Sequence, residues 1–149
     1  MEVQVRPLST IVAEFNSTAR KLIKMLEKKS RREDELANLD RLKKRISLLL
    51  SSMGDWILVQ EASPFFFKYS EQILDVNEQR REKFFMELDV SSEIAKNAGA
   101  LDKQNEFMLA LIESIRAHYR LASAAEKADV YQAVATMLAC CAEYAAIKK

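Results

Sequence analysis

Residues that break helices or form tight turns are almost absent from this chain, whose 149 residues include two glycines and two prolines. Glycine supplies the positive backbone angles of many turns and proline interrupts helices, so a chain with few of either consists largely of continuous helix. We therefore predict an all-α protein. The scarcity of glycine also weighs against the phosphate-binding loops of most nucleotide-binding folds, which need glycine for close backbone approach.

The length indicates one domain over residues 1–149. A chain of this size buries roughly 68 to 70% of the surface that its unfolded form exposes, which is enough for a core without staples. No internal repeat and no low-complexity linker marks a second domain. Within the domain, we expect residues 1–53 to form a long helical arm able to protrude, and residues 54–149 to form a helical bundle.

The first apolar stripe runs at three- and four-residue steps from Leu8 to Leu26, stops over residues 27–35, and resumes from Leu36 to Met53. Two interpretations fit. Residues 8–53 could form one rod of roughly 45 residues and about 65 Å, or a capping box of Ser and Glu at positions 30 and 33 could start a second helix. We favour the long or gently interrupted rod, because a solvated part of a protruding helix needs no apolar face.

A second long element is predicted after Gly54, which we expect to end the first as a left-handed cap. After a short apolar turn or helix, Ser63 as N-cap and Pro64 as first helical residue indicate a helix start. This helix would extend to Leu88 and run antiparallel to the first element. The predicted fold is thus a helical bundle in which a long N-terminal helix, or helix pair, packs antiparallel against a second long helix and two C-terminal helices.

The last third of the chain predicts three helices. Caps near position 90 indicate a short helix over residues 93–98, and a longer one should begin at Asp102. Ser123 and Glu126 have the spacing of a capping box, which predicts an alanine-rich helix over residues 124–147. The side chains expected on its buried line are Val130, Val134, Met137, Leu138, Cys141 and Ala145.

Aromatic residues are concentrated in the middle of the chain, where seven of the twelve lie between Trp56 and Phe85. The consecutive Phe65–Phe67 would cover about 200° of a helix, more than one neighbouring element can bury. Burying each ring is worth roughly 4 kcal/mol in gross terms. The rings therefore form a core corner, a surface for self-association or another protein, or, least favoured, a small-ligand pocket. The candidate interaction residues are Trp56, Phe65, Phe66, Phe67, Tyr69, Phe84 and Phe85.

Positive charge is concentrated in residues 1–53, which carry 12 Lys and Arg against 7 Asp and Glu, whereas residues 54–149 carry 11 against 15. A basic stripe could bind nucleic acid or an anionic membrane surface. However, acidic residues interleave with the basic ones, which favours local i, i+4 pairs on a solvated face, and no aromatic residue is available for base stacking. Docking onto an acidic part of this chain, or of another copy, is a further interpretation. The stripe residues are Lys28, Lys29, Arg31, Arg32, Arg41, Lys43, Lys44 and Arg45.

The residues that usually perform catalysis or bind metals are not arranged for either role. The single histidine, His118, lies five residues after Glu113 rather than the three of a di-iron helix motif, and no HExxH or CxxC spacing occurs. Cys140 and Cys141 are adjacent, about 3.8 Å apart between Cα atoms, too close for ordinary disulfide geometry. We therefore expect free thiols, no cofactor and no metal, and we predict that the protein is not an enzyme.

The sequence predicts a cytoplasmic or nuclear protein, since free thiols suit a reducing compartment and the first residues carry no signal-peptide pattern. Its longest uncharged runs are shorter than the roughly 20 apolar residues of a membrane span. As function we predict a protein-protein interaction or assembly module, such as a scaffold, that pairs with itself as a homodimer or higher oligomer, or with another protein. The alternative is a helical protein that binds nucleic acid or a membrane surface through the basic stripe.

Overall fold

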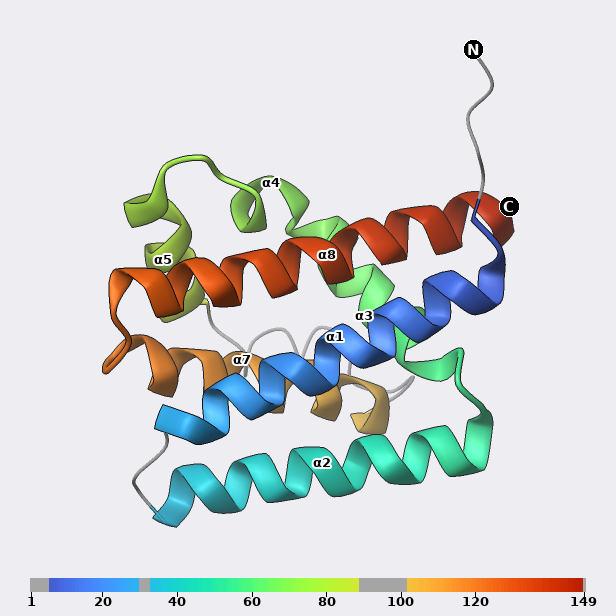
Figure 1. Ribbon diagram of the computed structural model, residues 1–149, viewed down its shortest axis with the longest axis horizontal. Coiled ribbons are helices and arrows are strands. Elements are labelled where there is room, and N and C mark those ends of the chain that lie inside the picture. Colours follow the sequence, from blue (N-terminus) through green and yellow to red (C-terminus); the bar gives the residue numbers. More distant parts are fainter. Residues whose placement is uncertain (1–5, 30–32, 89–101, 149) are drawn as a thin grey trace.

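The structure, a computed structural model, describes residues 6–29, 33–88 and 102–148. Within these ranges the chain is helical and contains no strand, so the predicted all-α fold is confirmed. The helices, in chain order, are α1 (Leu8–Lys29), α2 (Glu33–Met53), α3 (Ile57–Lys68), α4 (Ser70–Ile73), α5 (Glu78–Glu87), α7 (Asp102–Tyr119) and α8 (Ala124–Lys148) (Figure 1).

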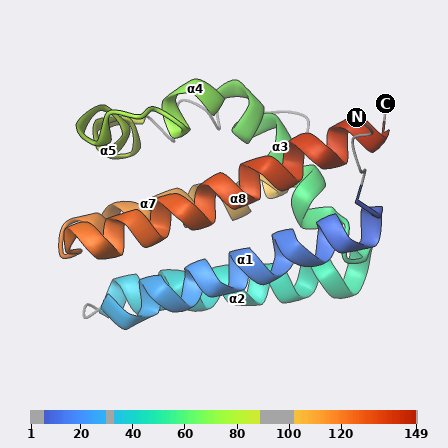
Figure 2. The ribbon, with the colours of Figure 1, turned by 45° about the horizontal axis from the view of Figure 1, so that its top comes forward.

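The helices pack in layers. Figure 2 shows α1 and α2 side by side on one side, α7 and α8 in the middle, and α4 and α5 on the other side. Helix α3 crosses between the layers and contacts α1, α2, α7 and α8. The core lies between these helices, and its largest fully buried side chains come from five of them. They include Phe15, Leu22 and Leu26 of α1, Leu39 and Leu42 of α2, Leu58 and Phe66 of α3, Ile73 of α4, and Ile112 and Ile115 of α7.

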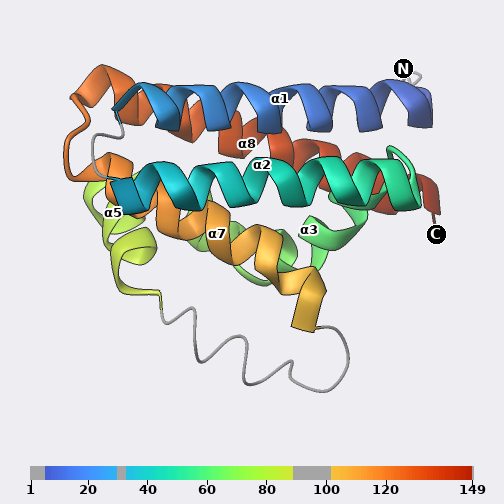
Figure 3. The same cartoon turned by 90° about the horizontal axis from the view of Figure 1, so that it is seen from below.

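The N-terminal rod that we favoured is wrong, because residues 8–53 form a helix pair. Helices α1 and α2 run antiparallel (Figure 3), and Lys43 Nζ of α2 lies 3.0 Å from Glu27 Oε1 of α1. Helix α1 does not protrude, because it packs along α8. Folding back allows both apolar stripes to be buried, while the polar stretch between them needs no cover. Residues 30–32, where the capping box was expected, lie outside the described residues.

The predicted helix start at Ser63 and Pro64 is also wrong, since both residues lie inside α3. The hydroxyl of Ser63 donates to the carbonyl of Val59 at 2.6 Å, the back-bonding of a serine within a helix rather than a cap. An internal proline costs a helix about 3 kcal/mol. Packing offsets this cost, because Ala62 before the proline and Phe66 after it are both buried on the same continuous face.

The second long helix that we expected up to Leu88 is interrupted twice. Helix α3 ends at Lys68, α4 is a single turn, and α5 starts only at Glu78. The Asp75 carboxylate accepts a hydrogen bond from the backbone N–H of Asn77 at 2.9 Å, and the Asn77 side chain accepts one from the N–H of Arg80 at 3.0 Å. The Asp75 side chain thus satisfies a backbone donor of the turn, and the Asn77 side chain caps the start of α5, so the predicted continuous helix is broken over residues 74–77.

Gly54 ends α2 as predicted, with φ of +99°, and its N–H donates to the Leu50 carbonyl at 3.1 Å. The predicted capping box is confirmed too, since the Ser123 N–H donates to the Glu126 carboxylate at 3.0 Å and the Glu126 N–H donates to the Ser123 hydroxyl at 3.2 Å. The helix predicted from Asp102 is confirmed as α7. The short helix predicted over residues 93–98 lies outside the described residues.

Helix α8 packs against α1 and α3 and buries most of the side chains predicted for its inner line, although Ala145 is only half-buried. Among the described helices, α8 is also long and apolar enough to cross a membrane by length and composition. The core helices of soluble proteins pass the same test, and nearly half of the apolar window of α8 is buried inside the fold.

Candidate functional site

Six aromatic rings form one connected row from α3 to α7. Successive ring centroids lie 6.1, 5.0, 5.2, 5.3 and 6.0 Å apart, within the range in which rings attract one another. The row connects α3 to α5 and α5 to α7, so part of the aromatic content of the middle of the chain holds these helices together. In order, the rings are Phe66, Phe65, Tyr69, Phe84, Phe85 and Tyr119.

The seven candidate interaction residues divide according to their exposure. Phe66 and Phe85 are core residues, 2% and 3% exposed, so they cannot contact a partner of the folded chain. Phe65, Tyr69 and Phe84 are half-buried within the row, and each presents only part of its ring to solvent. The two exposed members are Phe67 at 44% and Trp56 at 38%.

Two apolar residues that the sequence analysis missed lie exposed close to Phe67 in the chain. Leu74, which follows α4, is 40% exposed, and Val76, in the turn before α5, is 93% exposed. We name Phe67, Leu74 and Val76 the outer apolar residues. The sequence Asp75-Val76-Asn77 could have indicated the turn that exposes Val76, because Asp and Asn on both sides of a valine are typical of a turn rather than of a helix.

Side chains of α7 and α8 hold α5, the helix that follows these residues in the chain, in place. The guanidinium of Arg116 donates to the backbone carbonyls of Phe85, at 2.6 Å, and of Leu88, which satisfies carbonyls at the end of α5. Helix α5 also contacts α8. The Arg81 guanidinium lies 3.9 Å from the Tyr131 ring centroid, and Lys127 Nζ lies 2.9 Å from a Glu82 oxygen. Helix α5 is thus a fixed element.

The predicted basic stripe is divided between α1 and α2, which fold back on each other. On α2, the ammonium of Lys43 pairs with Glu27, and that of Lys44 lies 2.9 Å from Asp40 and lowers the pKa of its carboxyl. The Lys44–Asp40 pair has the i, i+4 spacing that the solvated-face interpretation predicted, whereas the Lys43–Glu27 pair joins α2 to α1. Arg45 is half-buried, and its charge opposes the upward shift that burial causes in the pKa of Glu61. The side chains of Lys29, Arg31 and Arg32 lie outside the described residues, and Arg41 lines a pocket.

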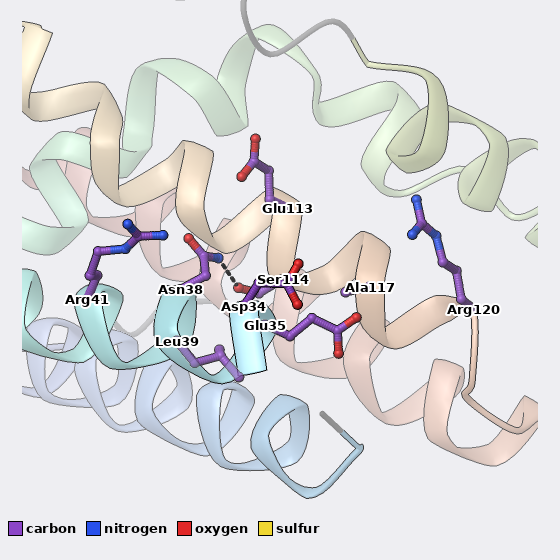
Figure 4. Close-up of a pocket in the computed structure, with 9 residues that line it drawn as sticks. All are labelled: Asp34, Glu35, Asn38, Leu39, Arg41, Glu113, Ser114, Ala117 and Arg120. Atoms are coloured by element: carbon purple, nitrogen blue, oxygen red, sulfur yellow. Dashed lines mark hydrogen bonds between the residues drawn. The ribbon is translucent and has the colours of Figure 1, made fainter. Parts of the chain in front are cut away.

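That pocket, of about 290 Å³, lies between α2 and α7. Figure 4 shows Arg41 and Arg120 at opposite ends, with Asn38 and Ser114 joined by a hydrogen bond between them. The Asn38 amide donates to the Ser114 hydroxyl at 2.9 Å, and Ser114 donates to the Ala110 carbonyl at 2.8 Å. Small-molecule sites are mostly apolar with a few polar groups, whereas charged side chains dominate here. The pocket therefore lacks the character of a ligand site.

The two cysteines and the histidine are buried. Cys140 and Cys141 are free thiols within the core, and burial raises their pKa values to about 12 and about 11. Such thiols stay protonated at neutral pH, and the protonated form is a poor nucleophile. His118 is 4% exposed within α7. No group of three or more His, Cys, Asp and Glu that could hold a metal ion occurs in the described part of the chain, and the absence of a metal remains a prediction.

Comparison with known proteins adds no assignment. No protein-family model, no curated protein and no solved structure matches this chain.

Proposed function

We propose that this protein is a non-enzymatic assembly module that pairs with a second copy of itself through Phe67, Leu74 and Val76. The observation that carries the proposal is the exposure of these three residues next to α5, a helix that α7 and α8 hold in place. The aromatic row joins α3 to α5, so a partner meets a preformed surface. A twofold pair is the commonest oligomer and would bring the same residues from each copy together.

The expected affinity is low. Full burial of a Val, Leu or Phe side chain is worth about 1.5 to 3 kcal/mol, so the exposed fractions of the three residues add up to about 4 kcal/mol in each copy. A symmetric pair would gain about twice that amount, and losing free translation and rotation costs about 4 to 15 kcal/mol. At the low end of that cost about 4 kcal/mol remains, so the pair should form only at about millimolar concentration.

Light scattering at several protein concentrations tests this proposal. The mass of the wild-type protein should rise above the 17.1 kDa of one chain as concentration increases. Phe67→Asp and Val76→Asp should remain monomeric with unchanged helical circular dichroism, because both side chains already face solvent. The matched control is Leu48→Asp, which alters an exposed leucine of α2 on the other side of the fold and should pair like the wild type. A wild-type protein that is monomeric throughout, or a control variant that fails to pair, would contradict the proposal.

The alternative function, binding of nucleic acid or of an anionic membrane through the basic stripe, would need charge that is free to meet phosphates. The ion pairs of Lys43 and Lys44 reduce that charge on α2. Binding to a DNA duplex or to anionic vesicles that weakens steeply as salt rises would favour this alternative. A cytoplasmic or nuclear location is part of the proposal and remains a prediction.

A further inference from the structure

A groove of about 770 Å³ runs between α1 and α8. The two helices lie side by side and antiparallel (Figure 1). This groove is separate from the outer apolar residues, because α1 lies on the opposite side of α8 from α4 and α5 (Figure 2). Along α1 its lining extends from Glu14 to Lys28, a length of about 21 Å at 1.5 Å per residue.

The α1 side of the groove carries three lysines. Lys21, Lys24 and Lys28 line it, and their three- and four-residue spacing places them on one face of the helix. Lys21 and Lys24 are exposed and form no ion pair with any described residue, unlike Lys43 and Lys44 of α2.

The two carboxylates of the groove offset this charge only in part. Arg6 Nη1 lies 2.7 Å from a Glu14 oxygen, and this hydrogen bond lowers the pKa of Glu14. Glu14 is therefore already paired, which leaves Asp129 on the α8 side as the acidic group of the lining that can offset Lys21 and Lys24. The groove has an excess of positive charge over its length.

The lining of the groove also includes two apolar side chains, which bear on the kind of anionic partner. Met25 is half-buried there and Ala133 is 8% exposed. Methionine adapts to varied apolar side chains. The described residues of the lining include no aromatic side chain on which a nucleic-acid base could stack. A partner that uses both features therefore carries carboxylates together with apolar side chains.

We propose that this groove binds an acidic amphipathic helical segment of another protein. Its apolar face would pack on Met25 and Ala133, while its carboxylates meet Lys21 and Lys24. A groove of about 21 Å accommodates about 14 helical residues. This inference does not rest on the proposed self-association, because it concerns a different surface.

The probe for the test is a fluorescently labelled synthetic helix of about 14 residues, with leucine along one face and glutamate elsewhere. Its anisotropy is followed as the full-length chain is added, at low and at moderate salt. Saturable binding that weakens with salt is expected. Two comparison probes are an oligoglutamate of the same length without leucine and a single-stranded DNA of the same charge, and both should bind at least tenfold more weakly than the amphipathic helix.

Charge reversal locates the binding site. Lys24→Glu should weaken binding of the helix about tenfold, because it replaces an attraction by a repulsion. The control Lys83→Glu makes the same charge change at an exposed lysine of α5 and should change affinity less than twofold. The proposal is overturned if the helix shows no saturable binding, if either comparison probe binds as tightly, or if the two variants behave alike. Light scattering on Lys24→Glu separates the two proposals, since self-association should be unaffected.

Discussion

The neighbouring rings Phe66 and Phe67 allow the burial of the aromatic run to be tested as a difference in stability. Phe66 is 2% exposed and Phe67 is 44% exposed, although both lie in the last turns of α3. A buried phenylalanine removes about 150 to 250 Å² from water, which at about 25 cal/mol per Å² corresponds to roughly 4 to 6 kcal/mol of gross burial. The sequence alone does not distinguish the two rings.

Phe66→Ala should therefore destabilise the protein by about 3 to 5 kcal/mol, because a cavity remains in the core. Phe67→Ala should cost about 1 to 2 kcal/mol, since half of that ring already contacts water and solvent fills the vacated space. With a urea slope of about 2 kcal/mol per molar, the midpoints should fall by about 2 M for Phe66→Ala and by less than about 1 M for Phe67→Ala.

The assay is urea unfolding followed by far-ultraviolet circular dichroism at low protein concentration, so that pairing does not add to stability. If Phe66→Ala leaves too little stability to measure, Phe66→Leu keeps most of the volume and should cost less than about 1.5 kcal/mol. Equal losses for the two alanine variants, or a larger loss at Phe67, would refute the assignment of Phe66 to the core and Phe67 to the surface.

Three further predictions concern local contacts. Ser123→Ala should lower the free energy of unfolding by about 1 kcal/mol in urea titrations, because it removes the cap at the start of α8. The Arg6 guanidinium lowers the pKa of Glu14, so this pair stabilises the fold above the ordinary carboxyl pKa and loses its effect as the pH falls. The free energy of unfolding of Arg6→Gln, measured in urea, should therefore depend less on pH between about pH 5 and pH 3 than that of the wild type. Cys140 and Cys141, with pKa values raised by burial to about 12 and about 11, should react with a thiol reagent at neutral pH only as fast as the chain unfolds, and rapid labelling in native buffer would contradict their burial.

The sequence by itself determined the features that depend on near neighbours in the chain. The fold class follows from the shortage of glycine and proline, and Gly54 and the Ser123–Glu126 capping box ended and began helices where expected. A cap involves groups within three or four residues of one another, so its hydrogen bonds can be inferred from spacing alone.

The tertiary structure decided what depends on distant partners. Pro64 lies inside a helix because residues on both sides of it are buried together, a gain that its local preference for a helix start does not include. The folding back of α2 on α1 depends on two distant helices, because α8 packs along α1 and α7 packs along α2. Likewise, in the last turns of α3 neighbouring helices cover Phe66 but leave Phe67 exposed. Local spacing determines where helices begin and end, whereas burial is a property of contacts between residues far apart in the chain.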